Sequence, residues 1–322
     1  MYSINSYGDM IGDRVRRETY LAALEKTVRP GDLVLELGTG PGFFAFAACK
    51  LGARVVAVEP EPIIQIAREI AAANGLSDRI QFIEDRSDRI TLPEKADVLL
   101  SDLRGVLPLH GAHLPAIVDA RTRLLKRGGV QIPETDAIWG AVVEASDTYR
   151  RSIEAWVENG SGLDMSAAWR LTVNTIQRFH FKPEHLATEP VLWATLDYTS
   201  LREPDVAGTL RFTAQRDATV HGVALWFDST LTDGISLSNA PSREPLVYGN
   251  FYLPFQRAVE LRAADAITVA ISARLVNDDY VWRWDTNVER DGNSCWRAKQ
   301  SSFYGAPLSL ANLRTRSQSQ EA

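Results

Sequence analysis

The stretch VLELGTGPGFFAFA, residues 34–47, runs from an apolar segment through a glycine-rich turn into a second apolar segment. Gly38, Gly40 and Gly42 fall in this turn, where glycine allows tight turning and close approach of a ligand to the backbone. A helix that begins directly after such a turn presents its N-terminal amides to the ligand. The stretch therefore predicts a strand–turn–helix unit that binds a nucleoside-containing cofactor.

Glu59 supports this prediction, because it closes the next β-rich run, ARVVAVE at residues 53–59. An acid at the end of the second strand can accept hydrogen bonds from both hydroxyls of a ribose. The alternative is that the glycines only form a tight turn and that Glu59 is a solvated strand end. Turn, spacing and acid agree with one another, and we therefore favour the nucleoside site.

Hydrophobic periodicity divides the chain into two regions. Between residues 31 and 144, nearly continuous apolar runs alternate with amphipathic helical patterns, which indicates an α/β domain with a doubly wound parallel sheet. From about residue 188, successive strands with period-two alternation indicate an antiparallel sandwich or barrel. We expect a helical segment at 1–30, a cofactor domain at 31–144, a β-barrel domain at 145–310 and a polar tail at 311–322.

Composition restricts the class of protein. The 322 residues carry 35 Lys and Arg against 41 Asp and Glu, and nucleic-acid binding usually requires a basic face. Cys49 and Cys295 form no metal-binding pair, and no apolar run is long enough for a membrane span or a signal peptide. We therefore expect a cytoplasmic protein with no metal, no nucleic-acid partner and no membrane partner.

With Glu36 in front, the turn reads E-L-G-T-G-P-G, which resembles motif I of the class I S-adenosylmethionine-dependent methyltransferases. The run VVAVEPEP at residues 55–62 resembles their acidic second strand. The resemblance implies a Rossmann-like fold, S-adenosyl-L-methionine as the cofactor and contact between its ribose and Glu59. The residues in the place where such proteins hold the adenine are Asp85, Arg86 and Ser87.

A more specific resemblance, to the protein arginine methyltransferases, covers the chain from residue 7 to about residue 290. The run SYGDMIGDRVRRETY is similar to the family's N-terminal helix, with Met10 and Arg16 in its cofactor-binding positions. The runs GLDMS, VHGVALWFD and LSNAPSREPLVYG resemble segments of its second domain. The resemblance implies a Rossmann-like domain followed by a β-barrel domain. It also implies a homodimer formed through an arm, for which part of residues 155–190 is the candidate.

The loop in which we expect the catalytic residues differs from the sequence pattern of the family. The resemblance implies that a substrate guanidinium is bound between two glutamates, one in S-E-x-x-G and one six residues after the glycine of that motif. Here SDLRG places Asp102 at the first position, and Gly111 stands at the second. A threonine–histidine–tryptophan motif is replaced by Val247, Tyr248 and Gly249. Because one carboxylate of the fork is missing, a guanidinium acceptor would be held and oriented less well.

Asp102 and His110 are the candidate catalytic bases on this loop, since a carboxylate or an imidazole can accept a proton from the acceptor. Candidate substrate contacts are Arg104, His113 and Tyr248. Each has a structural alternative: a loop or capping acid for Asp102, a surface or packing role for the histidines, solvation for Arg104 and barrel packing for Tyr248.

The favoured hypothesis is an S-adenosylmethionine-dependent methyltransferase that acts on nitrogen or oxygen of a small molecule or peptide. An arginine N-methyltransferase with a divergent active site is the alternative. A non-catalytic interaction protein with the same fold is the second alternative. A nicotinamide-dependent oxidoreductase is a further alternative, which the E-L-G-T-G-P-G pattern disfavours.

Overall fold

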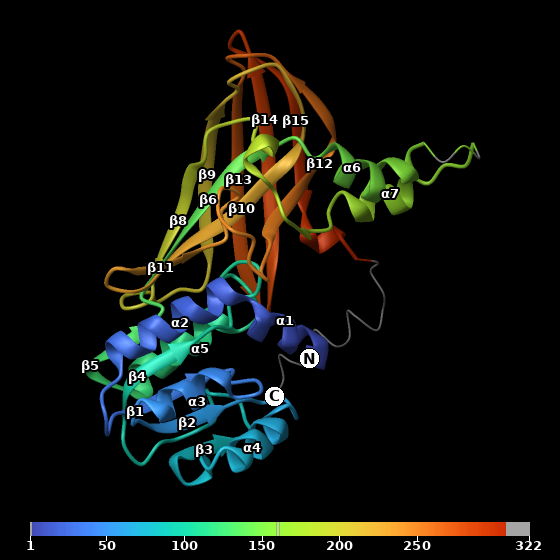
Figure 1. Ribbon diagram of the computed structural model, residues 1–322. Coiled ribbons are helices and arrows are strands. Elements are labelled where there is room, and N and C mark those ends of the chain that lie inside the picture. The colour runs from blue at the N-terminus through green and yellow to red at the C-terminus, as the bar shows by residue number, and fades with distance from the viewer. Residues whose placement is uncertain (1, 159, 161, 307–322) are drawn as a thin grey trace.

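The computed structural model describes residues 2–306 except 159 and 161, and it places two sheet-based domains one above the other (Figure 1). The expected polar tail at 311–322, and the last residues of the expected barrel range, lie outside the described residues. Helices α1 (Ile4–Gly12) and α2 (Arg14–Thr27) lie at the junction of the two domains (Figure 1). This arrangement leaves the N-terminal helices next to both domains.

The lower domain is built on a parallel sheet in the order β3-β2-β1-β4-β5. The apolar strands of this sheet are mostly buried, as expected where helices cover both faces. The strands are β1 (Leu33–Leu37), β2 (Arg54–Val58), β3 (Ile80–Ile83), β4 (Ala96–Ser101) and β5 (Leu125–Ile132). The helices between them are α3 (Phe43–Lys50), α4 (Ile64–Ala73) and α5 (His113–Arg123), with the short η1 (Ser77–Arg79).

The strand order reverses at β1, which lies between β2 and β4. In parallel α/β sheets, ligands bind outside the carboxyl ends of the strands at such a reversal. Leu37 at the end of β1 pairs with Ser101 at the end of β4, so the glycine turn and the Asp102 loop leave the sheet side by side. The topology therefore brings the cofactor motif and the predicted catalytic loop to one edge.

The upper domain consists of two antiparallel sheets. One has the order β7-β12-β10-β6-β8 with β11 paired to β10, and the other has the order β15-β14-β13-β9. The strands are β6 (Thr135–Val143), β7 (Gln177–Phe179), β8 (Val191–Asp197), β9 (Val206–Thr213), β10 (Ala218–Thr232), β11 (Ile235–Ser238), β12 (Asn250–Leu261), β13 (Ala266–Val276), β14 (Asp279–Arg290) and β15 (Asn293–Ser301). The expected Rossmann-like domain followed by an antiparallel β domain is confirmed.

The boundary expected after residue 144 is wrong by about one strand. β6 (Thr135–Val143) pairs antiparallel with β10 and β8 and belongs to the upper domain. Its sequence, TDAIWGAVV, carries no mark that separates it from the preceding strand. The change of sheet therefore comes at Thr135, directly after β5, and only tertiary pairing reveals it.

The described residues between 146 and 175 form a helical projection on the side of the upper domain (Figure 1). Its described elements are α6 (Ser146–Ser152), η2 (Glu154–Trp156) and α7 (Ser166–Thr172). Trp156 and Val157 within it are exposed, at 37% and 61%. The chain then returns to the sheet as β7, and two further short turns are η3 (Pro183–His185) and η4 (Ser302–Tyr304).

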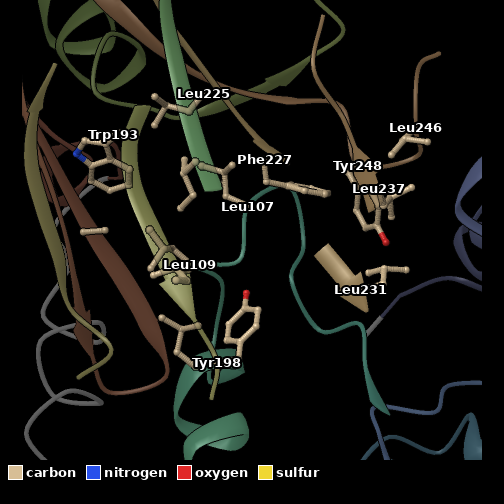
Figure 2. Packing of buried hydrophobic residues seen from close by; sticks show 14 of the residues in the cluster. Leu107, Leu109, Trp193, Tyr198, Leu225, Phe227, Leu231, Leu237, Leu246 and Tyr248 are labelled. Atoms are coloured by element: carbon tan, nitrogen blue, oxygen red, sulfur yellow. The ribbon is translucent and has the colours of Figure 1, made fainter. Parts of the chain in front are cut away.

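One hydrophobic cluster joins the two domains. The loop after β4 contributes Leu107 and Leu109, which lie among Trp193, Leu225 and Phe227 of the upper domain (Figure 2). All five side chains are buried. Because this loop is anchored in the upper domain at Leu107 and Leu109, its beginning at Asp102 is held between the two domains.

Candidate active site

Two cavities open at the edge where the glycine turn and the Asp102 loop meet. The first, of about 540 Å³, is lined by the glycine turn, α1, the Asp102 loop and the wall of the upper domain around Tyr248. The second, of about 520 Å³, is lined by the end of β2, residues 86–88 and the start of α5. The residues that line both are Gly38, Glu59, Glu61, Leu103 and His110.

The glycine turn is shaped by contacts that a side chain would block. Gly38 has φ +69°, and a Cβ there would lie 2.1 Å from Cδ2 of Leu103. Gly40 has φ +52°, and a Cβ there would lie 2.8 Å from the ring of Tyr7. Both glycines line the first cavity, whereas Gly42 caps α3 and lines neither cavity.

The two predicted glutamates accept hydrogen bonds from residues of this turn. Glu59 accepts hydrogen bonds from the amides of Gly40 and Glu61, each at 3.0 Å, and stands at the junction of the two cavities. Glu36 accepts a 2.6 Å hydrogen bond from the hydroxyl of Thr39. Burial raises the pKa of Glu36 to about 7, although the Thr39 hydrogen bond opposes this. Glu59 therefore lies where a ligand in either cavity could reach it, and its contact with a ribose stays a prediction, whereas Glu36 supports the turn itself.

Asp102 lies in a dense group of partners at the wall of the first cavity. Its Oδ2 accepts from Nε of Arg16 at 2.7 Å and from the hydroxyl of Tyr248 at 2.6 Å. Its Oδ1 accepts from the hydroxyl of Tyr20 at 3.0 Å, and Nε of Arg104 lies 3.2 Å away without hydrogen-bond geometry. Burial alone would raise the pKa of Asp102, but Arg16 and then Arg104 lower it below its ordinary value. Asp102 is therefore an ionised carboxylate that binds cations, and a weak base.

Arg104 is fully buried, so the expectation that it contacts substrate is wrong. Its Nη1 donates to Asp136 at 2.9 Å and its Nη2 donates to the hydroxyl of Tyr20 at 3.1 Å. Its guanidinium also stacks over Phe227, 4.7 Å from the ring centroid. Asp136 in turn accepts from the hydroxyl of Tyr198. The guanidinium of Arg104 thus lies between Asp102 of the same loop and Asp136 of β6 and forms an ion pair with each.

The two histidines of the loop have different surroundings. His110 is exposed, packs against Gly105 and lines both cavities, so its role as a base stays a prediction. His113 begins α5, is 1% exposed and lies 3.4 Å from the hydroxyl of Tyr198. Desolvation lowers the pKa of His113 to about 3, with Arg104 adding to the effect. His113 is therefore a neutral packing residue at the second cavity, and it does not reach the first.

The remaining predicted residues divide between the cavities. Met10, Arg16 and Tyr248 line the first cavity, and Arg86 and Ser87 line the second. Asp85 lines neither, and its carboxylate accepts from the amide of Arg86. Gly111 has φ +48°, and a Cβ there would meet only the carbonyl oxygen of Asp278, at 3.8 Å. Apart from the chain neighbours of Gly111, no described side chain comes within 4 Å of that Cβ position.

Sequence reasoning missed Tyr20 and Asp136, which complete the charge cluster, and Tyr2, Tyr7 and Arg178, which line the first cavity. Asp136 had a signal, because a charge within an apolar strand usually requires a buried partner. Tyr20 and Arg178 had none, since their roles depend on contacts between distant segments.

The comparisons with known proteins match the two domains separately. The family profile for the arginine methyltransferase oligomerization subdomain matches residues 135–288, and that for the ribosomal protein L11 methyltransferase (PrmA) matches residues 17–130. The two matches meet between β5 and β6, where the parallel sheet gives way to the antiparallel one.

Relatives and solved structures extend over both domains. The probable protein arginine N-methyltransferase 6 of Arabidopsis thaliana is 30% identical over 240 residues, which cover 70% of this chain and 54% of that protein. The arginine N(omega)-methyltransferase of Streptomyces achromogenes subsp. streptozoticus is 29% identical over 277 residues, which cover 81% and 74%. The Trypanosoma brucei PRMT1 enzyme–prozyme complex with AdoHcy superposes with a TM-score of 0.83 at 21% identity, over 92% of this chain and 97% of that one. The chain has a PRMT-like methyltransferase fold.

The PRMT-like resemblance expected from sequence is confirmed, and so is the fold class. The chain spans just over half the length of the Arabidopsis relative. The relatives are named arginine methyltransferases, which favours the alternative of an arginine acceptor over the small-molecule or peptide acceptor that we expected. Within the described residues, no helix is long and apolar enough to cross a membrane, and no group of three metal-ligating side chains is assembled.

Replacing Arg104 by methionine should destabilise this PRMT-like fold by about 3–5 kcal/mol, because Asp136 would remain buried without its cation. Chemical denaturation followed by circular dichroism measures the change. The R104M/D136N double variant removes both charges and should recover most of the loss. An equal loss in the single and double variants would contradict the ion-pair explanation.

Glu36 should make stability depend on pH. Its pKa of about 7 in the folded chain exceeds the ordinary 4.5, so the folded state keeps a proton that the unfolded chain loses. The free energy of unfolding should therefore fall by about 3 kcal/mol as pH rises from about 4.5 to about 7, since one pKa unit is about 1.4 kcal/mol. Glu36→Gln cannot ionise at this position. The free energy of unfolding of this variant should therefore rise relative to that of the wild type as the pH increases across this interval. Parallel pH profiles of the two proteins would refute this assignment.

Proposed function

We propose that the protein is an S-adenosylmethionine-dependent methyltransferase whose acceptor atom is a guanidino nitrogen of arginine, free or within a peptide. The observation that carries the proposal is Asp102, an ionised carboxylate in the cavity that also contains the glycine turn. A carboxylate there can hold a cationic acceptor next to the cofactor site. The names of the relatives support arginine as that acceptor.

The chain's residues fit the cofactor at three points. Gly38 and Gly40 line the first cavity, and the absence of a side chain at these positions lets Leu103 and Tyr7 pack close to the turn. Glu59 stands between the two cavities and can accept from ribose hydroxyls. Arg16, 8% exposed at the first cavity, can hold the cofactor's carboxylate. When bound, S-adenosylmethionine supplies an electrophilic methyl group and leaves as S-adenosylhomocysteine.

Arg16 would pair with Asp102 when the cofactor is absent and with the carboxylate of the cofactor when it is bound. In the structure Arg16 occupies Oδ2 of Asp102. A carboxylate presented to Arg16 competes for its guanidinium, which would release Oδ2 for the acceptor. Tyr20 and Arg104 hold Oδ1 and keep the carboxylate oriented and ionised. Tyr248, at 2.6 Å from Oδ2, would then contact the acceptor as well.

The missing glutamate at Gly111 has a chemical consequence. A guanidinium held by one carboxylate is less well oriented than one held by two, and misplacement by about 1 Å can cost about 100-fold in rate. His110 is the exposed group at both cavities that could accept the proton released from nitrogen. An acceptor without a guanidinium remains the second candidate, because Arg104 already supplies a guanidinium to Asp102.

Isothermal titration calorimetry and mass spectrometry test the proposal. The wild type should bind S-adenosylmethionine and methylate arginine or an arginine peptide on a guanidino nitrogen. Arg16→Met should weaken cofactor binding about 10-fold or more, since a charged hydrogen bond contributes about 1.5–3 kcal/mol. Arg14→Met changes an exposed arginine on the same helix and serves as the control. No binding by the wild type would contradict the proposal, and transfer only to other nucleophiles would support the second candidate.

We also infer that the protein forms a homodimer through the helical projection at residues 146–175. The matched oligomerization subdomain and the exposed Trp156 and Val157 support this. Val157→Asp should reduce the molar mass measured by light scattering toward that of one chain, because burial of a charge opposes association. Val276→Asp, at the exposed end of β13, is the control and should leave the mass unchanged. A monomeric wild type would contradict the inference.

A further inference from the structure

One arginine that lines the first cavity, Arg178, has no role in the fold or in the proposed chemistry described so far. Arg16 and Arg178 both line this cavity, and Arg16 is paired with Asp102. Arg178 is exposed, and within the described residues it takes part in no salt bridge. Among the described residues, its side chain makes one hydrogen bond, a 3.4 Å donation from Nη1 to the carbonyl oxygen of Val247. Its guanidinium is therefore available to a ligand in the cavity.

The backbone around Arg178 fixes where this cation lies. Arg178 is on β7 and pairs in register with Phe251 of β12, which lines the same cavity. Gly249 has φ +64°, and a Cβ there would lie 2.9 Å from Cγ of Arg178. The absence of a side chain at Gly249 thus lets the stem of Arg178 lie across the turn that carries Tyr248. Arg178 is held on the wall formed by the upper domain.

Asp102 and Arg178 act on the same cavity from different elements. Tyr2, which also lines it, shows this: burial raises the pKa of Tyr2, Asp102 raises it further and Arg178 lowers it. The other lining carboxylates are Glu36 and Glu59, which hydrogen-bond the glycine turn, and Glu61 beside them. Among the described residues, the acceptor part of the cavity is therefore lined by one carboxylate, Asp102, and by one cation outside any salt bridge, Arg178.

We propose that Arg178 is a specificity-determining residue that binds the carboxylate of a small amino-acid acceptor. The inference rests on the proposed function, in which Asp102 holds the guanidinium of that acceptor. A free ω-guanidino acid such as arginine carries a cation and an anion at opposite ends and complements both groups. An arginine-rich peptide has no carboxylate at this place and brings further cations toward Arg178, which disfavours it electrostatically. The acceptor class is therefore a small zwitterion.

Acceptor competition tests this assignment with the full chain and S-adenosylmethionine. The acceptors are arginine, agmatine, which lacks the carboxylate, argininamide, in which it is neutralised, and an arginine–glycine peptide. The wild type should show a kcat/KM for arginine about 10- to 100-fold above that for the other three, which is the range of one charge-assisted hydrogen bond. Arg178→Gln should lower kcat/KM for arginine by this factor, mainly through KM, and leave agmatine unchanged. Arg211→Gln, on β9 and outside both cavities, is the control.

The outcomes separate this inference from the proposed function. Methylation of agmatine or the peptide as efficiently as arginine, or an equal effect of Arg178→Gln on all acceptors, would overturn the role of Arg178 and leave the proposed function standing. Transfer to none of the four acceptors would overturn both. Because Arg178 is exposed, Arg178→Gln should fold normally. Equal melting temperatures of this variant and the wild type check that a loss is not a folding defect.

Discussion

The carboxylate of Asp102, whose side chain is only 9% exposed, is the constraint on which the site depends. A charge removed from water is tolerated only when cations and hydrogen-bond donors surround it. Here the donors come from α2 and the upper domain, and Arg104 of the same loop adds a second cation and continues to Asp136 on β6. Satisfying one carboxylate therefore joins the N-terminal helices and both domains at the place where a methyl group would be transferred.

This cluster also explains how a loop with one carboxylate remains ordered. The family pattern has a longer glutamate and a second one, whereas this chain has a shorter acid, an internal arginine and a glycine. Arg104 and Tyr20 occupy one oxygen of Asp102, and Arg16 and Tyr248 occupy the other. One side of the carboxylate is thus structural. The other is occupied by Arg16, a residue that the cofactor would also engage.

Local patterns were sufficient to predict the glycine turn, the acid of β2 and the change from parallel to antiparallel sheet. These features depend on residues near one another in sequence, where periodicity and glycine placement carry the information. The first strand of the upper domain was assigned to the wrong side of the boundary, because β6 is defined by pairing with β10, a segment far along the chain. Arg104 and His113 were misjudged for the same reason: their burial is produced by Asp136 and Tyr198.

The central claim is that Arg16 is shared between Asp102 and the cofactor. It is tested most directly by a crystal structure of the protein with S-adenosylhomocysteine. The account predicts that Arg16 pairs with the carboxylate of that ligand, that Oδ2 of Asp102 is freed, and that Tyr20 and Arg104 remain on Oδ1. An Arg16 still paired with Asp102, with the ligand's carboxylate bound elsewhere, would contradict it.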